Sequence, residues 1–101
     1  MTTAEGLLKT RIRKFFTARG IFWSSIQGGP GSKPGDPDLI ACIKGHFVGI
    51  EVKTAGGRQS PIQKKREEEI NASGGRYVVV RKMEEIEKLL EEYNVSESKE
   101  E

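Results

Sequence analysis

Two metal-binding residue types are almost absent from this chain. Its 101 residues include one cysteine and one histidine. A single cysteine excludes a disulfide framework, and the two residues together exclude a Cys/His zinc site built from this chain alone. No apolar run approaches the roughly 20 residues of a membrane span, and the N-terminus lacks the apolar core of a signal peptide. We therefore expect an intracellular, cytoplasmic protein that does not contact a membrane.

Charge is unevenly distributed along the chain, although the formal net charge is only +2. Residues 1–66 hold twelve Lys and Arg against four Asp and Glu, whereas residues 67–101 hold five against eleven. A basic region of this size is what binding to a polyanion such as nucleic acid requires. Solvated helix faces that happen to segregate by sign would give the same count, so charge alone leaves both interpretations open.

Hydrophobic periodicity and turn residues predict one α/β domain with the element order α-β-β-β-α-β-α. A helix over residues 4–18, capped by Thr2 or Thr3, precedes β-strands over 21–27, 38–43 and 47–53. A second helix begins at Ser60-Pro61 and ends at Gly74-Gly75. A strand over 77–80 and an amphipathic helix over 83–93 complete the domain, which we place at residues 1–95. Residues 96–101 are expected to be a disordered acidic tail.

The turn between the second and third strands predicts which side chains meet. If Lys44-Gly45 forms a two-residue loop, Asp38 lies directly opposite Glu51 on one face of the hairpin. Lys53, two residues beyond Glu51, points to that same face. A three-residue loop would send Asp38 to the other face, unless a bulge corrected the register.

Such a cluster of two carboxylates and a lysine can support chemistry. The carboxylates repel each other by about 1 to 4 kcal/mol unless a cation lies between them. Hard oxygen ligands at the open, water-accessible end of a hairpin suit Mg²⁺ or Mn²⁺. A lysine beside the metal can orient a water and stabilise charge on a phosphate. The structural alternative is an ordinary cross-strand salt bridge between Lys53 and its acidic neighbours.

The residues around this cluster resemble a known family. Pro37-Asp38-Leu39 followed by Glu51-Val52-Lys53 is a PD…ExK pattern, similar to the PD-(D/E)XK nuclease superfamily. The Gly-rich loop before it, a Gly-Arg loop after it and SPIQ opening a helix look like the VRR-NUC family of virus-type replication-repair nucleases. The resemblance covers about residues 5–82. It implies a restriction-endonuclease-like core, a small mixed β-sheet flanked by helices.

The resemblance also implies roles for individual residues. It implies that Asp38 and Glu51 are metal ligands, with the backbone carbonyl of Val52 as a further metal oxygen. It also implies that Lys53 is the catalytic lysine, that Gln63 is a helix-opening glutamine that faces the site, and that Glu5 is an acidic residue supplied by the first helix. Gln63 could instead serve only the capping box begun by Ser60, and Glu5 could serve only to cap the first helix.

Residues outside the cluster receive weaker predictions. The loops that flank it carry Ser32, Lys33 and Arg58, which could contact phosphates or be ordinary loop residues. We interpret His46 as a surface residue at the hairpin tip and Cys42 as a core residue. The P-loop pattern GxxxxGK[ST] is absent, and we expect no organic cofactor.

The function implied is a Mg²⁺-dependent DNA endonuclease, with Mn²⁺ able to substitute, in replication, repair or recombination of a phage or bacterium. Branched DNA such as a four-way junction is the expected substrate. The alternatives are a non-catalytic nucleic-acid-binding module of the same fold, or a nuclease that prefers flaps or strand ends. We also expect a homodimer, because paired cuts need two sites. Its candidate surfaces are the apolar residues Phe15, Phe16, Ile21, Phe22 and Trp23, and the last helix with Ile86, Leu89, Leu90 and Tyr93.

Overall fold

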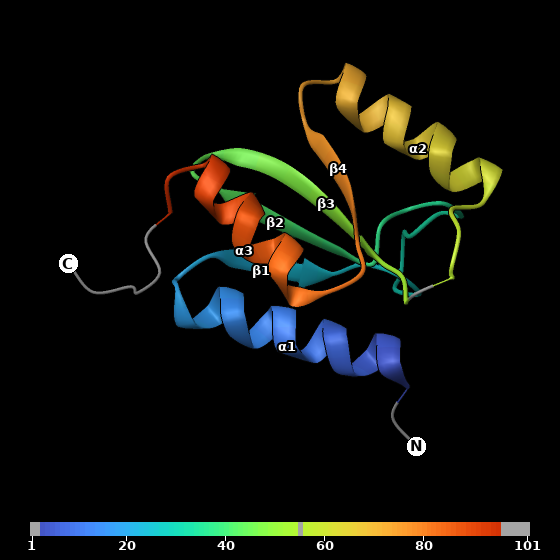
Figure 1. Cartoon of the computed structure of the whole chain (residues 1–101). Helices are drawn as coiled ribbons and strands as arrows, with labels where there is room; N and C mark the ends of the chain where they lie inside the picture. Colours follow the sequence, from blue (N-terminus) through green and yellow to red (C-terminus); the bar gives the residue numbers. More distant parts are fainter. Residues whose placement is uncertain (1–2, 55, 96–101) are drawn as a thin grey trace.

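The computed structural model describes residues 3–54 and 56–95. Thr2 and the predicted tail lie outside the described residues. The element order is as predicted (Figure 1): α1 Ala4–Ala18, β1 Phe22–Ser25, β2 Leu39–Ile43, β3 His46–Val52, α2 Pro61–Ala72, β4 Arg76–Val80 and α3 Met83–Glu92. β1 is shorter than predicted, and Thr3 is the N-cap of α1. Within the described ranges, no helix has the length and apolarity needed to cross a membrane.

The four strands form one mixed sheet in the order β1-β2-β3-β4. The first three pair antiparallel, and β3 pairs parallel with β4. The register of the β2–β3 hairpin is the predicted one, with Leu39 opposite Ile50 and Ile43 opposite His46. Lys44 and Gly45 both have positive φ, 52° and 84°, which matches the twist of a two-residue hairpin turn. The turn therefore sends alternate residues of both strands to the same face.

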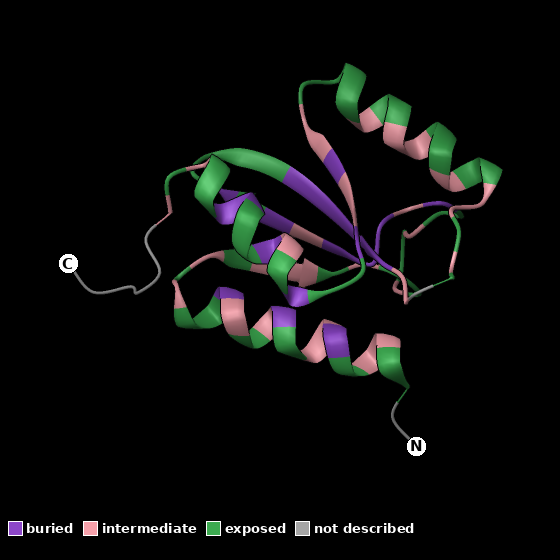
Figure 2. Cartoon of the chain, viewed as in Figure 1, coloured by how far each residue is buried: buried purple, intermediate pink, exposed green. Residues whose placement is uncertain are grey.

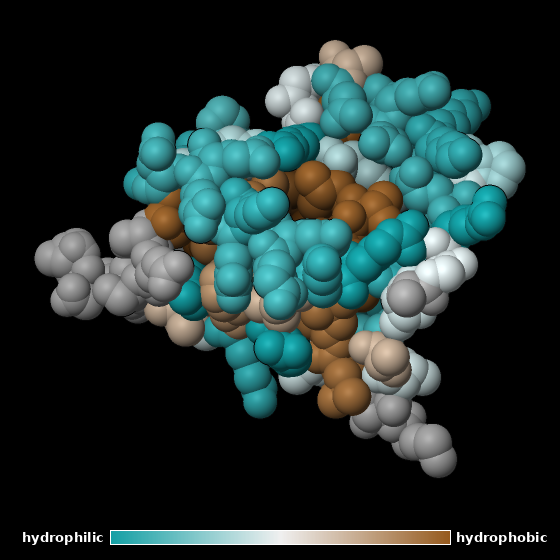
Figure 3. All heavy atoms as spheres, in the orientation of Figure 1, coloured by the Kyte–Doolittle hydropathy of each residue, from teal (hydrophilic) through white to brown (hydrophobic). Residues whose placement is uncertain are grey.

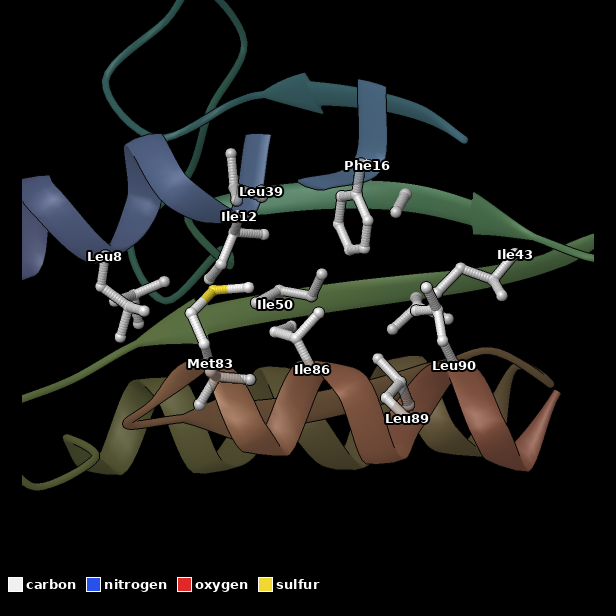
Figure 4. Packing of buried hydrophobic residues seen from close by; sticks show 14 residues of the cluster. Leu8, Ile12, Phe16, Leu39, Ile43, Ile50, Met83, Ile86, Leu89 and Leu90 are labelled. Carbon is white, nitrogen blue, oxygen red and sulfur yellow. The ribbon is translucent and has the colours of Figure 1, made fainter. Parts of the chain in front are cut away.

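One face of the sheet carries the hydrophobic core. Figure 4 shows side chains of α1 and α3 converging on those of β2 and β3. Their spacing of three and four residues along each helix places them on one stripe facing the sheet. The buried residues of this cluster include Leu8, Ile12 and Phe16 of α1, Leu39 and Ile43 of β2, Ile50 of β3, and Met83, Ile86, Leu89 and Leu90 of α3. The apolar stripe of α3 is thus occupied inside the chain, which removes it as a dimer surface.

The other face of the sheet is only partly covered. α2 lies on it near β4 and contributes no fully buried residue (Figure 2). In the view of Figure 3, hydrophilic side chains cover α2 and α3, and hydrophobic atoms show between these helices. Cys42 of β2 points to this partly covered face and is exposed. The prediction that Cys42 belongs to the core is wrong, because none of the described helices and strands covers this part of β2.

Two glycines let the loop before β2 approach the rest of the domain. A Cβ on Gly49 would lie 2.9 Å from the ring of Pro37, so the missing side chain lets Pro37 pack on β3. Gly35 has a φ of 89°, and a Cβ there would lie 2.7 Å from the carbonyl oxygen of Ile62 in α2. Arg66 of α2 holds the same loop by donating to the Pro34 carbonyl. These contacts fix the position of Asp38, which follows Pro37.

Substitution of Gly35 tests this packing against α2. Gly31→Ala should lower the free energy of unfolding by about 1–2 kcal/mol, because Gly31 has a positive φ but a Cβ there would meet no atom within 4 Å. Gly35→Ala incurs the same backbone strain and a clash with Ile62, which should add about 1–3 kcal/mol. Urea denaturation of both variants measures the difference. Equal losses would show that the loop does not press on α2.

Candidate active site

Asp38 and Glu51 lie together at the end of the β2–β3 hairpin, as the register predicted. The Val52 amide donates a hydrogen bond of 2.9 Å to Asp38 Oδ2, which ties the loop before β2 to the end of β3. Asp38 is 6% exposed and Glu51 3% exposed. The expectation of an open site is therefore wrong for the carboxylates, because β4, α1 and α2 surround the end of the hairpin. A buried carboxylate needs a cation or hydrogen-bond donors to remain charged.

Each carboxylate has its own lysine partner. Lys53 Nζ lies 3.6 Å from Glu51 Oε2, and Lys9 Nζ of α1 lies 3.5 Å from Asp38 Oδ1. Both lysine side chains are about one-fifth to one-quarter exposed, at 18% for Lys53 and 26% for Lys9. The site therefore consists of two buried carboxyl groups with two cations on their solvent side. An arrangement with this charge pattern can hold a cation or a phosphate at its mouth.

Gln63 fulfils both roles that the sequence left open. Its Oε1 accepts from the Ser60 amide at 2.9 Å, and its own backbone amide donates to Ser60 Oγ, which completes the capping box. Its Nε2 donates to Glu51 Oε2 at 2.9 Å. Since the cap holds the oxygen of the side-chain amide, the nitrogen is directed at the carboxylate. The start of α2 thus positions a neutral donor in the site.

Glu51 keeps one unused acceptor. Its Oε1 is buried and has no hydrogen-bond partner among the described residues, whereas Oε2 contacts Gln63 and Lys53. Burial, with a smaller contribution from the charge of Asp38, raises the pKa of Glu51 from 4.5 to about 7. Lys53 and Lys9 oppose this change without cancelling it. An additional positive charge next to Oε1 would favour the ionised form.

The first helix contributes a residue that the sequence analysis missed. Glu5 is half-buried on α1, and none of the hydrogen bonds or ion pairs found between described residues joins it to the site. Lys9, one turn later on the same side of the helix, contacts Asp38 instead. The spacing of four residues from Glu5 is the signal that could have identified Lys9. Glu5 remains a predicted site residue that lies one helical turn away from the observed contact.

Tyr77 of β4 also borders the site. Its hydroxyl is buried, and burial together with the charge of Glu51 raises its pKa to about 12. Tyr77 therefore keeps its proton and can act only as a neutral group. The sequence offers no signal for this position, because Tyr77 belongs to a run of apolar residues that is typical of a core strand.

The predicted loop residues are separated by the fold. Lys33, next to Ser32, lines a cavity with Asp36, Arg66 and Glu69, so acidic and basic side chains balance there. Arg58 lines a different cavity beside β4. His46 is exposed at the hairpin tip, where its ring lies 4.8 Å from that of Tyr93, as expected for a surface residue. The structure thus brings neither Lys33 nor Arg58 into contact with the two carboxylates.

The donor set fits a hard divalent cation. Within residues 3–54 and 56–95, no group of three or more His, Cys, Asp or Glu side chains could hold a metal ion. Two carboxylates remain, and the unpartnered Oε1 of Glu51 provides a free, buried oxygen ligand. Oxygen donors with few side-chain ligands are typical of Mg²⁺, which keeps several waters and uses phosphate oxygens. The residues present therefore fit Mg²⁺ better than zinc.

Comparison with known proteins supports the interpretation of this site. No protein-family model and no curated protein matches the chain. A solved structure named "VRR_NUC domain" superposes with a TM-score of 0.74 and 27% identity, covering 91% of this chain and 99% of the other. Another, named "VRR_NUC domain protein", has a TM-score of 0.70 and 21% identity, covering 92% and 89%. At this lower identity the second structure supports the fold alone.

The small mixed sheet with its three helices is the fold of these two solved structures. The two structural matches extend over most of the chain, and the PD…ExK residues occupy one site in it. The match at 27% identity agrees with the resemblance to the VRR-NUC family that the sequence motif indicated.

The raised pKa of Glu51 predicts how stability depends on pH. The folded protein binds this proton up to about pH 7, whereas the unfolded chain releases it near pH 4.5. The contribution is therefore complete below about pH 4.5 and is lost as the pH rises through about 7, amounting to about 3 kcal/mol. Glu51→Gln should lack this loss. Urea denaturation at about pH 5 and about pH 8 measures it, and parallel pH profiles of the two proteins would contradict the assignment.

Proposed function

We propose that this protein is a metal-dependent nuclease that hydrolyses phosphodiester bonds in DNA. The observation that supports the proposal most strongly is the buried pair Asp38 and Glu51, with Lys53 in contact with Glu51. A domain that kept this fold only for binding would have little reason to bury two carboxylates together, because their repulsion and desolvation destabilise the fold.

Asp38 and Glu51 would hold the metal ion, with the Val52 carbonyl as a further oxygen. Mg²⁺ bound there, or Mn²⁺ in its place, would polarise the scissile phosphate and lower the pKa of a bound water. The free Oε1 of Glu51 is the acceptor best suited to this contact. Gln63 holds the other oxygen of that carboxylate in a fixed orientation.

The lysines would act on the substrate. Lys53 is partly exposed beside Glu51, so its ammonium group can orient the attacking water or stabilise charge that develops on the phosphate. Lys9 of α1 contacts Asp38 and can contribute a second positive charge at the mouth of the site. Both roles need a cation that is close to the carboxylates but reachable from solvent.

The competing class is a nucleic-acid-binding module without catalysis. A panel of matched DNA substrates, comprising duplex, flap, splayed-arm and four-way junction, separates the two classes and tests the preference for branched DNA. A nuclease cleaves at least one substrate with Mg²⁺ or Mn²⁺ and none with EDTA. A binding module retains DNA under all conditions without cutting it. If the protein cleaves flaps or strand ends preferentially, these replace the four-way junction as the proposed substrate.

Conservative substitutions test the catalytic residues. Asp38→Asn, Glu51→Gln and Lys53→Met should each lower the cleavage rate by at least about 100-fold, because the first two weaken the metal site and the third removes the cation beside the reacting phosphate. Conservative variants are needed because Asp38 and Glu51 are buried and hydrogen-bonded. Lys88→Met, at an exposed position of α3, is the matched control and should leave the rate unchanged. Cleavage at the normal rate by any of the first three variants would refute the site.

A second pair of variants and a metal titration complete this experiment. Ser60→Ala weakens only the cap of α2, whereas Gln63→Ala also removes the donor to Glu51. Gln63→Ala should therefore lose more cleavage activity than Ser60→Ala when the two variants are equally stable.

Mg²⁺ should raise the melting temperature of the wild type but not that of Glu51→Gln, since a ligand that binds only the folded state stabilises that state. An equal rise in both would place the metal elsewhere.

We also propose that the protein acts as a homodimer. Three residues of the partly covered sheet face lie side by side on neighbouring strands, since Phe22 pairs with Cys42 and Cys42 pairs with Phe47. Phe22 is 66% exposed and Phe47 45% exposed. Of the other predicted dimer residues, Phe16 is fully buried, and Phe15, Ile21 and Trp23 pack against the core. An exposed apolar row across β1, β2 and β3 supports contact with a second copy.

Light scattering of two charge-neutral variants tests the dimer. Phe22→Ser should shift the mass at micromolar concentration from about two chains toward one, because it removes the most exposed ring of the row. Leu7→Ser is the control, since Leu7 is 55% exposed but lies on α1. A wild-type mass of one chain throughout, with junction cleavage intact, would exclude the dimer.

A further inference from the structure

A basic cavity lies next to the candidate active site. It measures about 610 Å³ and is bounded by the loop after β3, the start of α2 and the end of β4. Three of its lining side chains are positively charged, and none of the described lining residues carries a carboxylate. The lining residues are Gly56, Gly57, Arg58, Gln59, Lys64, Val79 and Arg81.

Three connections place this cavity beside the reacting groups. Val79 is paired with Glu51 in the parallel β3–β4 ladder, where neighbouring strands are roughly 4.8 Å apart. Lys64 directly follows Gln63, whose amide contacts Glu51. A Cβ on Gly57 would lie 3.5 Å from the side chain of Lys53. The cavity and the carboxylates are therefore adjacent parts of one surface.

The cationic side chains that line the cavity form no ion pair with any other described residue. No ion pair among the described residues involves Arg58 or Lys64. The Arg81 guanidinium donates to the carbonyls of Thr54 and Gly57, at 3.0 and 2.7 Å, which hold the loop without cancelling the charge. The cavity that Lys33 lines differs in this respect, because Asp36 and Glu69 border it. Cations that have no ion-pair partner in a concave, polar site attract an anion.

We propose that this cavity binds a phosphodiester group of the DNA strand, next to the phosphate that is cut at Asp38, Glu51 and Lys53. The inference rests on the proposed function and adds a substrate-binding site to it. Lys64 and Arg58 would contact the phosphate oxygens, and Arg81 would contribute charge while holding the loop in place. Such contacts carry no base sequence information, so they position the backbone rather than select a sequence.

Binding as a function of salt tests this site. The probe is a fluorescein-labelled duplex oligonucleotide in EDTA, followed by fluorescence anisotropy over a series of NaCl concentrations. Each lost phosphate contact reduces the slope of log K against log[NaCl] by about 0.9. Lys64→Gln and Arg58→Gln should therefore each flatten the slope by about one, and the double variant by about two. Neither side chain is buried, so these variants should fold as the wild type does.

Lys88→Gln is the matched control, since it removes the same charge from an exposed position of α3. A slope for Lys64→Gln equal to that of Lys88→Gln would overturn the phosphate site. Cleavage by the wild type decides the proposed function separately. Normal cleavage with no effect of Lys64→Gln would refute only this inference, whereas salt-dependent binding through Lys64 without any cleavage would refute only the nuclease.

Discussion

The register of the β2–β3 hairpin is the constraint on which the candidate site depends. Lys44 and Gly45 adopt positive φ values and close a two-residue turn. Because side chains alternate along a strand, a shift of one residue would send Asp38 to the opposite face from Glu51. The same shift would turn either Leu39 or Ile50 away from the core. Burial of the core therefore also fixes the position of the carboxylates.

Two buried carboxylates in one place make this end of the hairpin unfavourable without partners. The protein supplies them from three different elements: the Val52 amide from β3, the Gln63 amide from α2 and the Lys9 ammonium from α1. These partners still leave the pKa of Glu51 raised to about 7 and its Oε1 unpartnered among the described residues. The protein thus compensates the burial of the two carboxylates only in part. A bound cation would therefore stabilise the site.

α2 has a different role from the other two helices. It packs on the partly covered face of the sheet and has no fully buried residue, so it contributes little to the core. Its first turn instead supplies Gln63, whose side chain is oriented by the cap at Ser60. Lys64 follows on the side of the basic cavity, and Arg66 holds the loop before Asp38. The helix therefore acts mainly as a support for the site and its surroundings.

The sequence by itself determined the element order, and it favoured the hairpin register that brings the two carboxylates together. These features depend on local signals: periodicity, the turn residues Lys44-Gly45 and the capping box at Ser60. Tertiary structure alone decided that Lys9 rather than Glu5 contacts Asp38, that Cys42 is exposed, and that Arg58 shares a cavity with Lys64. Each of these depends on how a helix is placed against the sheet. That placement follows from packing between residues far apart in the chain. Local periodicity shows which face of a helix is apolar, but it does not show where the helix lies on the sheet.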